Sequence, residues 1–277
     1  MVKWRGGRRS GNVIDIRGNK GKVALGGGSI IVLLLALLFG VDPSQLLALL
    51  GDGGGAASVQ TSGEVPPQDE AGDFVSVILA DTEDTWNSLF RKAGATYREP
   101  ELVLYSGTVQ SACGLSGAAT GPFYCPNDQR VYLDLSFFRQ LQRLGASGDF
   151  AVAYVIAHEI GHHVQNLEGT LGEIQRLRQR LPPAEANQLS VRTELKADCY
   201  AGVWAHHAEA ERDRLEAGDV REGIDAAAAV GDDNLQGPHA SPDSFTHGTS
   251  AQRVEWFQQG FQSGSVDACD TFADLRR

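Results

Sequence analysis

The stretch Phe150-Ala-Val-Ala-Tyr-Val-Ile-Ala-His-Glu-Ile-Gly-His-His-Val-Gln165 carries the strongest chemical signal in the chain. It is largely apolar, and Gly148-Asp149 precede it as a favourable start for a helix. Helix-tolerant residues continue to about Leu167. We therefore expect a buried central helix, around which the rest of a domain is built.

Two histidines and a glutamate lie on this expected helix. His158 and His162 are four residues apart, so both imidazoles share one helix face. Two such nitrogens can bind one zinc ion, and Glu159, offset by about 100°, can take a proton from a zinc-bound water. This His-Glu-x-x-His pattern is typical of zinc metalloproteases. His163 points about 100° away from His162 and is expected at the surface or behind the metal ligands.

A zinc site of this kind needs a third protein ligand and leaves the fourth position to water. Residues 189–204 follow Pro182-Pro183 and are expected to form a second helix. Glu194 and Asp198 are again four residues apart, so Glu194 can bind the metal while Asp198 accepts the remaining N–H of a ligating histidine. A solvated acidic face is the alternative interpretation. Four other histidines are alternative third ligands: His206, His207, His239 and His247.

These patterns resemble a known family. His158-Glu-x-x-His162 followed by Glu194-x-x-x-Asp198 is similar to the gluzincin pattern. Longer strings resemble the bacterial neutral zinc metallopeptidase family of single-pass membrane proteins. The strings are Lys3-Trp-Arg-Gly-Gly-Arg-Arg-Ser, Gly121-Pro-Phe-Tyr-Cys-Pro, Val131-Tyr-Leu-Asp-Leu-Ser-Phe-Phe, Glu194-Leu-Lys-Ala-Asp-Cys-Tyr-Ala-Gly and Thr246-His-Gly-Thr-Ser-Ala-Gln-Arg. The resemblance implies a zincin-like fold and zinc-dependent peptide hydrolysis, without identifying a physiological substrate.

The resemblance also implies roles outside the two helices. A histidine donates to the tetrahedral oxyanion in gluzincins, and His247 is the candidate here, with a plain loop histidine as the alternative. It precedes Thr249–Gln252, a capping box that should begin a helix reaching Phe261. Arg130–Leu135 is expected to be a strand, and an edge strand at this place binds an extended peptide in related peptidases. Arg253 is a candidate to brace a carboxylate of the site.

The N-terminal end differs from the rest of the chain in charge. Residues 1–22 hold seven Lys or Arg and one acid, whereas the whole chain has a net charge of -11. Residues 23–41 carry no charge and as a helix would extend roughly 28 Å, close to the ~30 Å hydrocarbon core of a bilayer. The positive-inside rule then predicts one transmembrane helix, preceded by a basic cytoplasmic segment over residues 1–22. A cleaved signal peptide is the alternative.

Residues 42–73 are rich in Gly, Pro and acidic residues, and they are expected to form a flexible linker. The folded domain is then 74–277, on the extracytoplasmic or periplasmic side of a bacterial cell membrane. Its acidic excess argues against nucleic acid as a partner.

The four cysteines all follow the expected membrane segment, in what should be an oxidising compartment. Cys113 and Cys125 are close in sequence, so the economical pairing is Cys113–Cys125 with Cys199–Cys269. Four buried free thiols are the alternative.

The sequence therefore predicts an α+β domain in which a small mixed sheet packs on a helical body and the metal lies between two helices. The predicted function is that of a membrane-anchored zinc metallopeptidase acting on peptides or proteins. Its predicted zinc ligands are His158, His162 and Glu194, and Glu159 is the predicted base. One alternative is a membrane-tethered binding or scaffold protein with a structural or vestigial zinc site. Another is a subunit that is inactive without a partner.

Overall fold

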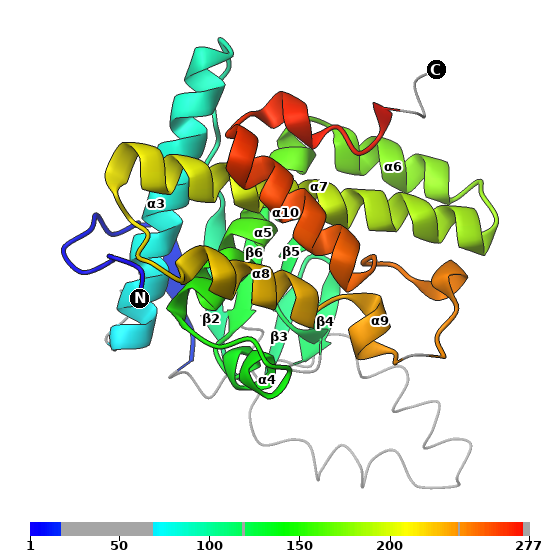
Figure 1. Cartoon of the computed structure of the whole chain (residues 1–277), viewed down its shortest axis with the longest axis horizontal. Coiled ribbons are helices and arrows are strands. Elements are labelled where there is room, and N and C mark those ends of the chain that lie inside the picture. The colour runs from blue at the N-terminus through cyan, green and yellow to red at the C-terminus, as the bar shows by residue number, and fades with distance from the viewer. Residues whose placement is uncertain (18–68, 118–119, 238, 274–277) are drawn as a thin grey trace, which may run out of the picture. The chain divides into compact units, whose positions relative to one another are not determined.

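The computed structural model describes residues 1–17, 69–117, 120–237 and 239–273 (Figure 1). The expected membrane segment 23–41, and most of the expected linker 42–73, lie outside the described residues. Among the helices that are described, none is both long and apolar enough to cross a membrane.

The HExxH helix α5 (Asp149–Leu167) lies at the centre of a helical body, as the sequence predicts (Figure 1). It contacts α3 on one side and α7 and α8 on another, and α10 packs across α7 and α8. The neighbouring long helices are α3 (Glu70–Lys92), α7 (Pro183–Arg212), α8 (Asp219–Ala229) and α10 (Ser250–Ser263). The shorter helices are α4 (Phe137–Arg143), α6 (Thr170–Arg178) and α9 (Asp232–Leu235).

A glycine within the HExxH motif sets the distance between α5 and α7. A Cβ added at Gly161 would lie 2.9 Å from the carbonyl oxygen of Ala197 and 3.0 Å from its Cα. Backbone atoms cannot move aside as a flexible side chain can, so any larger residue would push the two helices apart. This close approach brings the turn that carries His162 against the turn that carries Glu194.

A four-stranded mixed sheet packs against the helical body, in the order β1-β2-β6-β5. The pairs β1–β2 and β2–β6 are parallel, whereas β5–β6 is antiparallel. A separate antiparallel hairpin consists of β3 and β4. The strands are β1 (Val13–Asp15), β2 (Glu101–Tyr105), β3 (Thr108–Ser111), β4 (Gly114–Gly117), β5 (Phe123–Cys125) and β6 (Arg130–Asp134). The predicted α+β class, with a small mixed sheet on a helical body, is confirmed.

The sheet order corrects one expectation. Arg130–Leu135 was expected to supply an edge strand for peptide binding, and β6 does form there. However, β6 is hydrogen bonded to β2 on one side and to β5 on the other, so its backbone has no free edge. The edge strand on this side of the sheet is β5.

Residues Met1–Arg17, which we call the N-terminal arm, belong to the same compact unit as the rest of the described chain. Strand β1 of the arm extends the sheet by pairing with β2. Arg8 Nη2 donates to Glu83 Oε2 at 2.9 Å, and the Glu83 side chain is only 1% exposed. Arg9 pairs with Asp73, and Arg17 Nη2 donates to Asp69 Oδ1 at 2.9 Å.

Residues Met1–Arg17 thus pack as part of the folded unit, although residues 1–22 were expected to be a segment separate from it. The positive charges that suggested a separate segment are paired with carboxylates of the folded domain. The domain boundary also moves, because α3 begins at Glu70 with Asp69 as its side-chain cap, four residues ahead of the expected start at 74.

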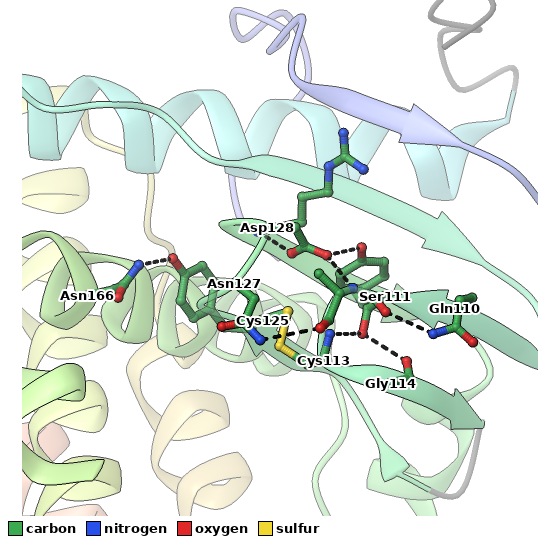
Figure 2. The surroundings of a disulfide bond; sticks show 12 residues. Gln110, Ser111, Cys113, Gly114, Cys125, Asn127, Asp128 and Asn166 are labelled. Atoms are coloured by element: carbon green, nitrogen blue, oxygen red, sulfur yellow. Dashed lines mark hydrogen bonds between the residues drawn. A yellow bond between two sulfur atoms is a disulfide. The ribbon is translucent and has the colours of Figure 1, made fainter. Parts of the chain in front are cut away.

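Both predicted disulfides are present. Cys113–Cys125 joins the turn between β3 and β4 to the end of β5 (Figure 2). Beside it, Asp128 accepts hydrogen bonds from the backbone N–H of Ala112 at 2.9 Å and from the Tyr132 hydroxyl at 2.8 Å. Cys199–Cys269 ties α7 to the 3-10 helix η3 (Val266–Cys269).

Candidate functional site

The three predicted zinc ligands converge between α5 and α7. His158 Nε2 lies 3.1 Å from Glu194 Oε2, and His162 Nε2 lies 3.4 Å from Glu194 Oε1. Atoms bound to one tetrahedral ion at ~2.0–2.1 Å are about 3.3 Å apart. The cluster thus has the donor types and the spacing of a zinc site with three protein ligands. These three form a compact cluster of potential metal-binding groups within the described part of the chain.

A buried network holds His158 in the orientation that a metal ligand needs. Its Nδ1–H donates to Asp198 Oδ1 at 2.8 Å, which directs Nε2 toward the cluster. Asp198 is fully buried and also accepts from Arg253, with Nε to Oδ2 at 2.8 Å and Nη2 to Oδ1 at 2.9 Å. The hydroxyl of Tyr154, one turn before His158, donates to the same carboxylate. Asp198 and Arg253 thus lie where the sequence interpretation placed them, whereas Tyr154 was missed.

The charges of the cluster favour a bound cation. Burial opposes the ionised form of Glu194, but His162 and His158 outweigh it and hold the pKa of Glu194 well below its usual range. Burial also opposes the charged form of His158, yet Asp198 and Glu194 raise the pKa of His158 to about 9. A metal ion bound at His158 Nε2 must therefore displace a proton.

Glu159 lies beside the cluster and is 8% exposed. Burial raises its pKa above the usual range for a glutamate, although the charges of His158 and His162 act in the opposite direction. Within the described residues its carboxylate has no hydrogen bond or ion pair, and it lines the cleft together with the cluster. Its carboxylate is therefore free to accept a proton from a bound water.

His247 lines the same cleft from the loop before α10. Asp232, which is 2% exposed, accepts the backbone N–H groups of Thr246, His247 and Gly248 at 2.6–3.0 Å. His247 Nδ1 lies 3.3 Å from the other oxygen of this carboxylate. The loop is thus fixed by one buried acid, which the sequence analysis missed because the two partners are 15 positions apart.

The other histidines that were alternative third ligands do not line the cleft. His206 Nδ1 contacts the carbonyl oxygen of Phe261 at 2.8 Å, His207 contacts Glu211, and His239 is exposed. His163 is completely buried, so its expected surface position is wrong.

His163 connects α5 to β5. Its Nε2–H donates to the carbonyl oxygen of Arg98 at 2.6 Å, and its Nδ1 accepts from the Tyr124 hydroxyl at 3.0 Å. Burial lowers the pKa of His163 to about 4. Asn166 also donates to the Tyr124 hydroxyl, at 2.9 Å (Figure 2). Together with the disulfide at Cys125, these bonds fix the edge strand beside the cleft.

The cleft has a volume of about 580 Å³. The predicted ligands, Glu159 and His247 all line it, and β5 forms part of its wall. Away from the cluster the wall is mainly apolar, with the side chains Phe123, Phe137, Leu144, Val230 and Leu235.

Residues 2–272 match the model of a protein family described as "Putative neutral zinc metallopeptidase". The chain belongs to this family. It is 46% identical over 98% of its length to the uncharacterized protein YpfJ of Escherichia coli (strain K12), of which 99% is covered. It is 38% identical over 87% of its length to the uncharacterized protein Rv2575 of Mycobacterium tuberculosis (strain ATCC 25618 / H37Rv), of which 86% is covered. No solved structure is significantly similar to the chain.

Proposed function

We propose that this protein is a zinc metallopeptidase with a gluzincin-like ligand set of His158, His162 and Glu194. The observation that carries the proposal is the free carboxylate of Glu159 beside a cluster with zinc-ligand spacing. A purely structural zinc site has no use for a glutamate that binds no other described group and faces the cleft beside the cluster. The zincin-like fold is part of the proposal.

Zinc held by these ligands would acidify a bound water and polarise the scissile carbonyl. Glu159 takes a proton from the attacking water and passes it to the leaving amine, and its raised pKa suits both transfers. His247 faces the cleft and donates to the oxyanion. Asp198, Arg253 and Tyr154 do not touch the substrate, and their role is to hold His158 in place.

The substrate is a peptide bound in extended form along β5. The outer edge of β5 has no partner strand among the described residues, and the strand lines the cleft. An extended peptide can add to such an edge through backbone hydrogen bonds.

The test compares zinc content and peptidase activity of the full chain with those of Glu159→Gln. We expect Glu159→Gln to keep its zinc and to lose at least about 100-fold in kcat, because general base catalysis is removed. Glu173→Gln, an exposed acid on α6, is the matched control and should be unchanged. Absence of hydrolysis by all three proteins on every peptide would support the scaffold alternative, and equal hydrolysis by all three would refute the role of Glu159.

His247→Ala tests the oxyanion role. Zinc content should stay the same and kcat should fall by roughly 100-fold, because only the transition state is affected. His239→Ala, on an exposed histidine of the same region, is the control. Loss of zinc in His247→Ala would make His247 a ligand and refute the gluzincin-like set.

We also propose that residues 23–41 bind the protein to a bacterial membrane and that the domain is extracytoplasmic. The two disulfides support an oxidising compartment. The contacts between the N-terminal arm and the domain support the same side for residues 1–17.

Single cysteines can be introduced at Gly11 in the arm and at Glu255 on α10, since both positions are exposed and all four native cysteines are paired. In intact cells whose outer envelope is opened, a membrane-impermeant maleimide should label both variants equally. Labelling at residue 255 alone would support a single membrane-spanning helix with the N-terminal arm in the cytoplasm. Labelling at neither position would place the domain in the cytoplasm.

A further inference from the structure

We propose that the cleft continues into a carboxylate-binding subsite formed by Arg178, which makes acidic peptides the preferred substrates. This inference rests on the proposed peptidase function. A second cavity, of about 410 Å³, adjoins the cleft and shares part of its wall. The shared residues are Pro126, Leu171, Thr193 and Glu194. A peptide bound at the cluster can therefore reach into this cavity.

Arg178 is the last residue of α6 and lines the second cavity. Its Nε is shielded from solvent and has no hydrogen-bond acceptor among the described residues. A buried N–H without an acceptor destabilises the folded state, so a carboxylate that displaces the atoms covering Nε and accepts its hydrogen bond recovers this loss. Arg176 and Arg180 flank it on the same segment but are exposed to water.

The missing partner is unusual for an arginine of this chain that is not exposed. Acids outnumber bases by 35 to 24, so a half-buried cation has many potential partners. Arg253 is bonded to Asp198, and Arg212 and Arg214 are both bonded to Asp81. Arg178 has no such carboxylate within the part of the chain that is described.

The other lining groups leave the positive charge uncompensated. Glu194 is the single acid in the wall, and its oxygens face His158 and His162. The hydroxyls of Ser190 and Thr193 donate to carbonyl groups of their own helix. The amides Asn127, Asn166 and Gln175 complete a polar wall. A guanidinium in such surroundings is suited to a planar carboxylate, which it can bind through two parallel hydrogen bonds.

The carboxylate can come from an acidic side chain or from the C-terminus of the substrate. Two sets of peptides separate these sources. In the first set, each pair has either Glu or Gln at one position, and that position is moved along the peptide. In the second set, each pair has either a free or an amidated C-terminus. Each peptide is assayed with the wild-type full chain, Arg178→Gln, Arg178→Lys and the exposed control Arg176→Gln.

For carboxylate-bearing peptides, kcat/KM should fall about 10–100-fold in Arg178→Gln, because a hydrogen bond to a charged group contributes about 1.5–3 kcal/mol. Neutral peptides should be cleaved equally by all variants, and Arg178→Lys should recover part of the loss. Selectivity in the Glu/Gln pair identifies a side-chain subsite, and selectivity in the acid/amide pair identifies C-terminal recognition. An equal loss on all peptides, or no loss on any, would overturn the subsite.

Binding measurements keep this inference separate from the proposed function. The affinities of the same fluorescent peptides are measured with zinc-loaded Glu159→Gln protein, with and without Arg178→Gln. Absence of hydrolysis by the wild-type protein would count against the peptidase proposal alone. Affinities that depend neither on the peptide carboxylate nor on residue 178 would refute the subsite, whether or not the wild-type protein hydrolyses peptides. Unchanged zinc content and melting temperature confirm that the variants are folded.

Discussion

The metal cluster and the N-terminal arm are both held by charged groups, but they differ in how the sequence encodes them. The cluster takes His158 and His162 from α5 and Glu194 from α7. On each helix the residues of the site are four positions apart, and this spacing can be recognised in the sequence. The arm is fixed by contacts such as Arg8–Glu83 and Arg17–Asp69, between residues more than 50 positions apart. Local spacing therefore predicted the candidate ligands, whereas charge composition alone predicted a separate segment for residues that pack on the domain.

Zinc binding tests the cluster most strongly. Glu194→Ala leaves two histidine ligands, so zinc affinity should fall by more than the roughly 100-fold upper range for outer contacts. Asp198→Ala removes only the partner of His158 and should weaken binding about 10–100-fold. Zinc titration of each purified protein measures both effects. Glu185→Ala, on an exposed acid of α7, is the control, and an Asp198 effect larger than that of Glu194 would contradict the assigned ligand set.

His163 shows how one helix combines a metal site with a structural contact. Its pKa is about 4 in the folded protein and about 6.5 when unfolded, so the unfolded state binds the proton first as the pH falls. The free energy of unfolding should therefore fall progressively as the pH drops below about 6.5, and the loss should reach about 3 kcal/mol at about pH 4. Urea unfolding at several pH values should show a weaker pH dependence for His163→Gln than for the wild type. An unchanged dependence would contradict the lowered pKa.

The ion pairs of the N-terminal arm should contribute unequally to the free energy of unfolding, because their carboxylates differ in burial. Arg8→Ala removes a partner of the buried Glu83 and should lower the free energy of unfolding by about 1–3 kcal/mol. Arg5→Ala breaks an exposed pair with Glu70 and should change it by about 0–1 kcal/mol. Denaturant unfolding measures both. Equal effects would mean that burial of Glu83 adds nothing to its pairing.

Sequence patterns predicted much of the fold and of the site. The extent of α5, the capping box of α10 and the β6 segment follow from spacing and local propensity. A helix was also predicted over residues 189–204, but α7 extends beyond it on both sides, from Pro183 to Arg212. The four cysteines allowed the pairing to be predicted from their separation alone.

Features that depend on tertiary contacts could not be predicted in this way. The position of β5 outside β6 depends on strand order, which no local pattern encodes. Asp232 and Tyr154 act on residues of the site through contacts that only the folded chain creates. Burial of His163 likewise follows from its contact with Arg98, 65 positions away.

Arg17 and Asp69 are hydrogen bonded to each other, so the folded domain is continuous in space across the gap in sequence between them. A truncation starting near Phe74 would remove β1 and the cap of α3, and with them part of the sheet. Joining residue 17 to residue 69 through a short Gly-Ser bridge would instead keep both. Replacing about fifty residues by about six lowers the entropic cost of closing this loop by about 2 kcal/mol, and this stabilises the folded state. Such a shortened chain should be more stable than the parent chain, and it would lack the residues 23–41 that we propose to bind the membrane.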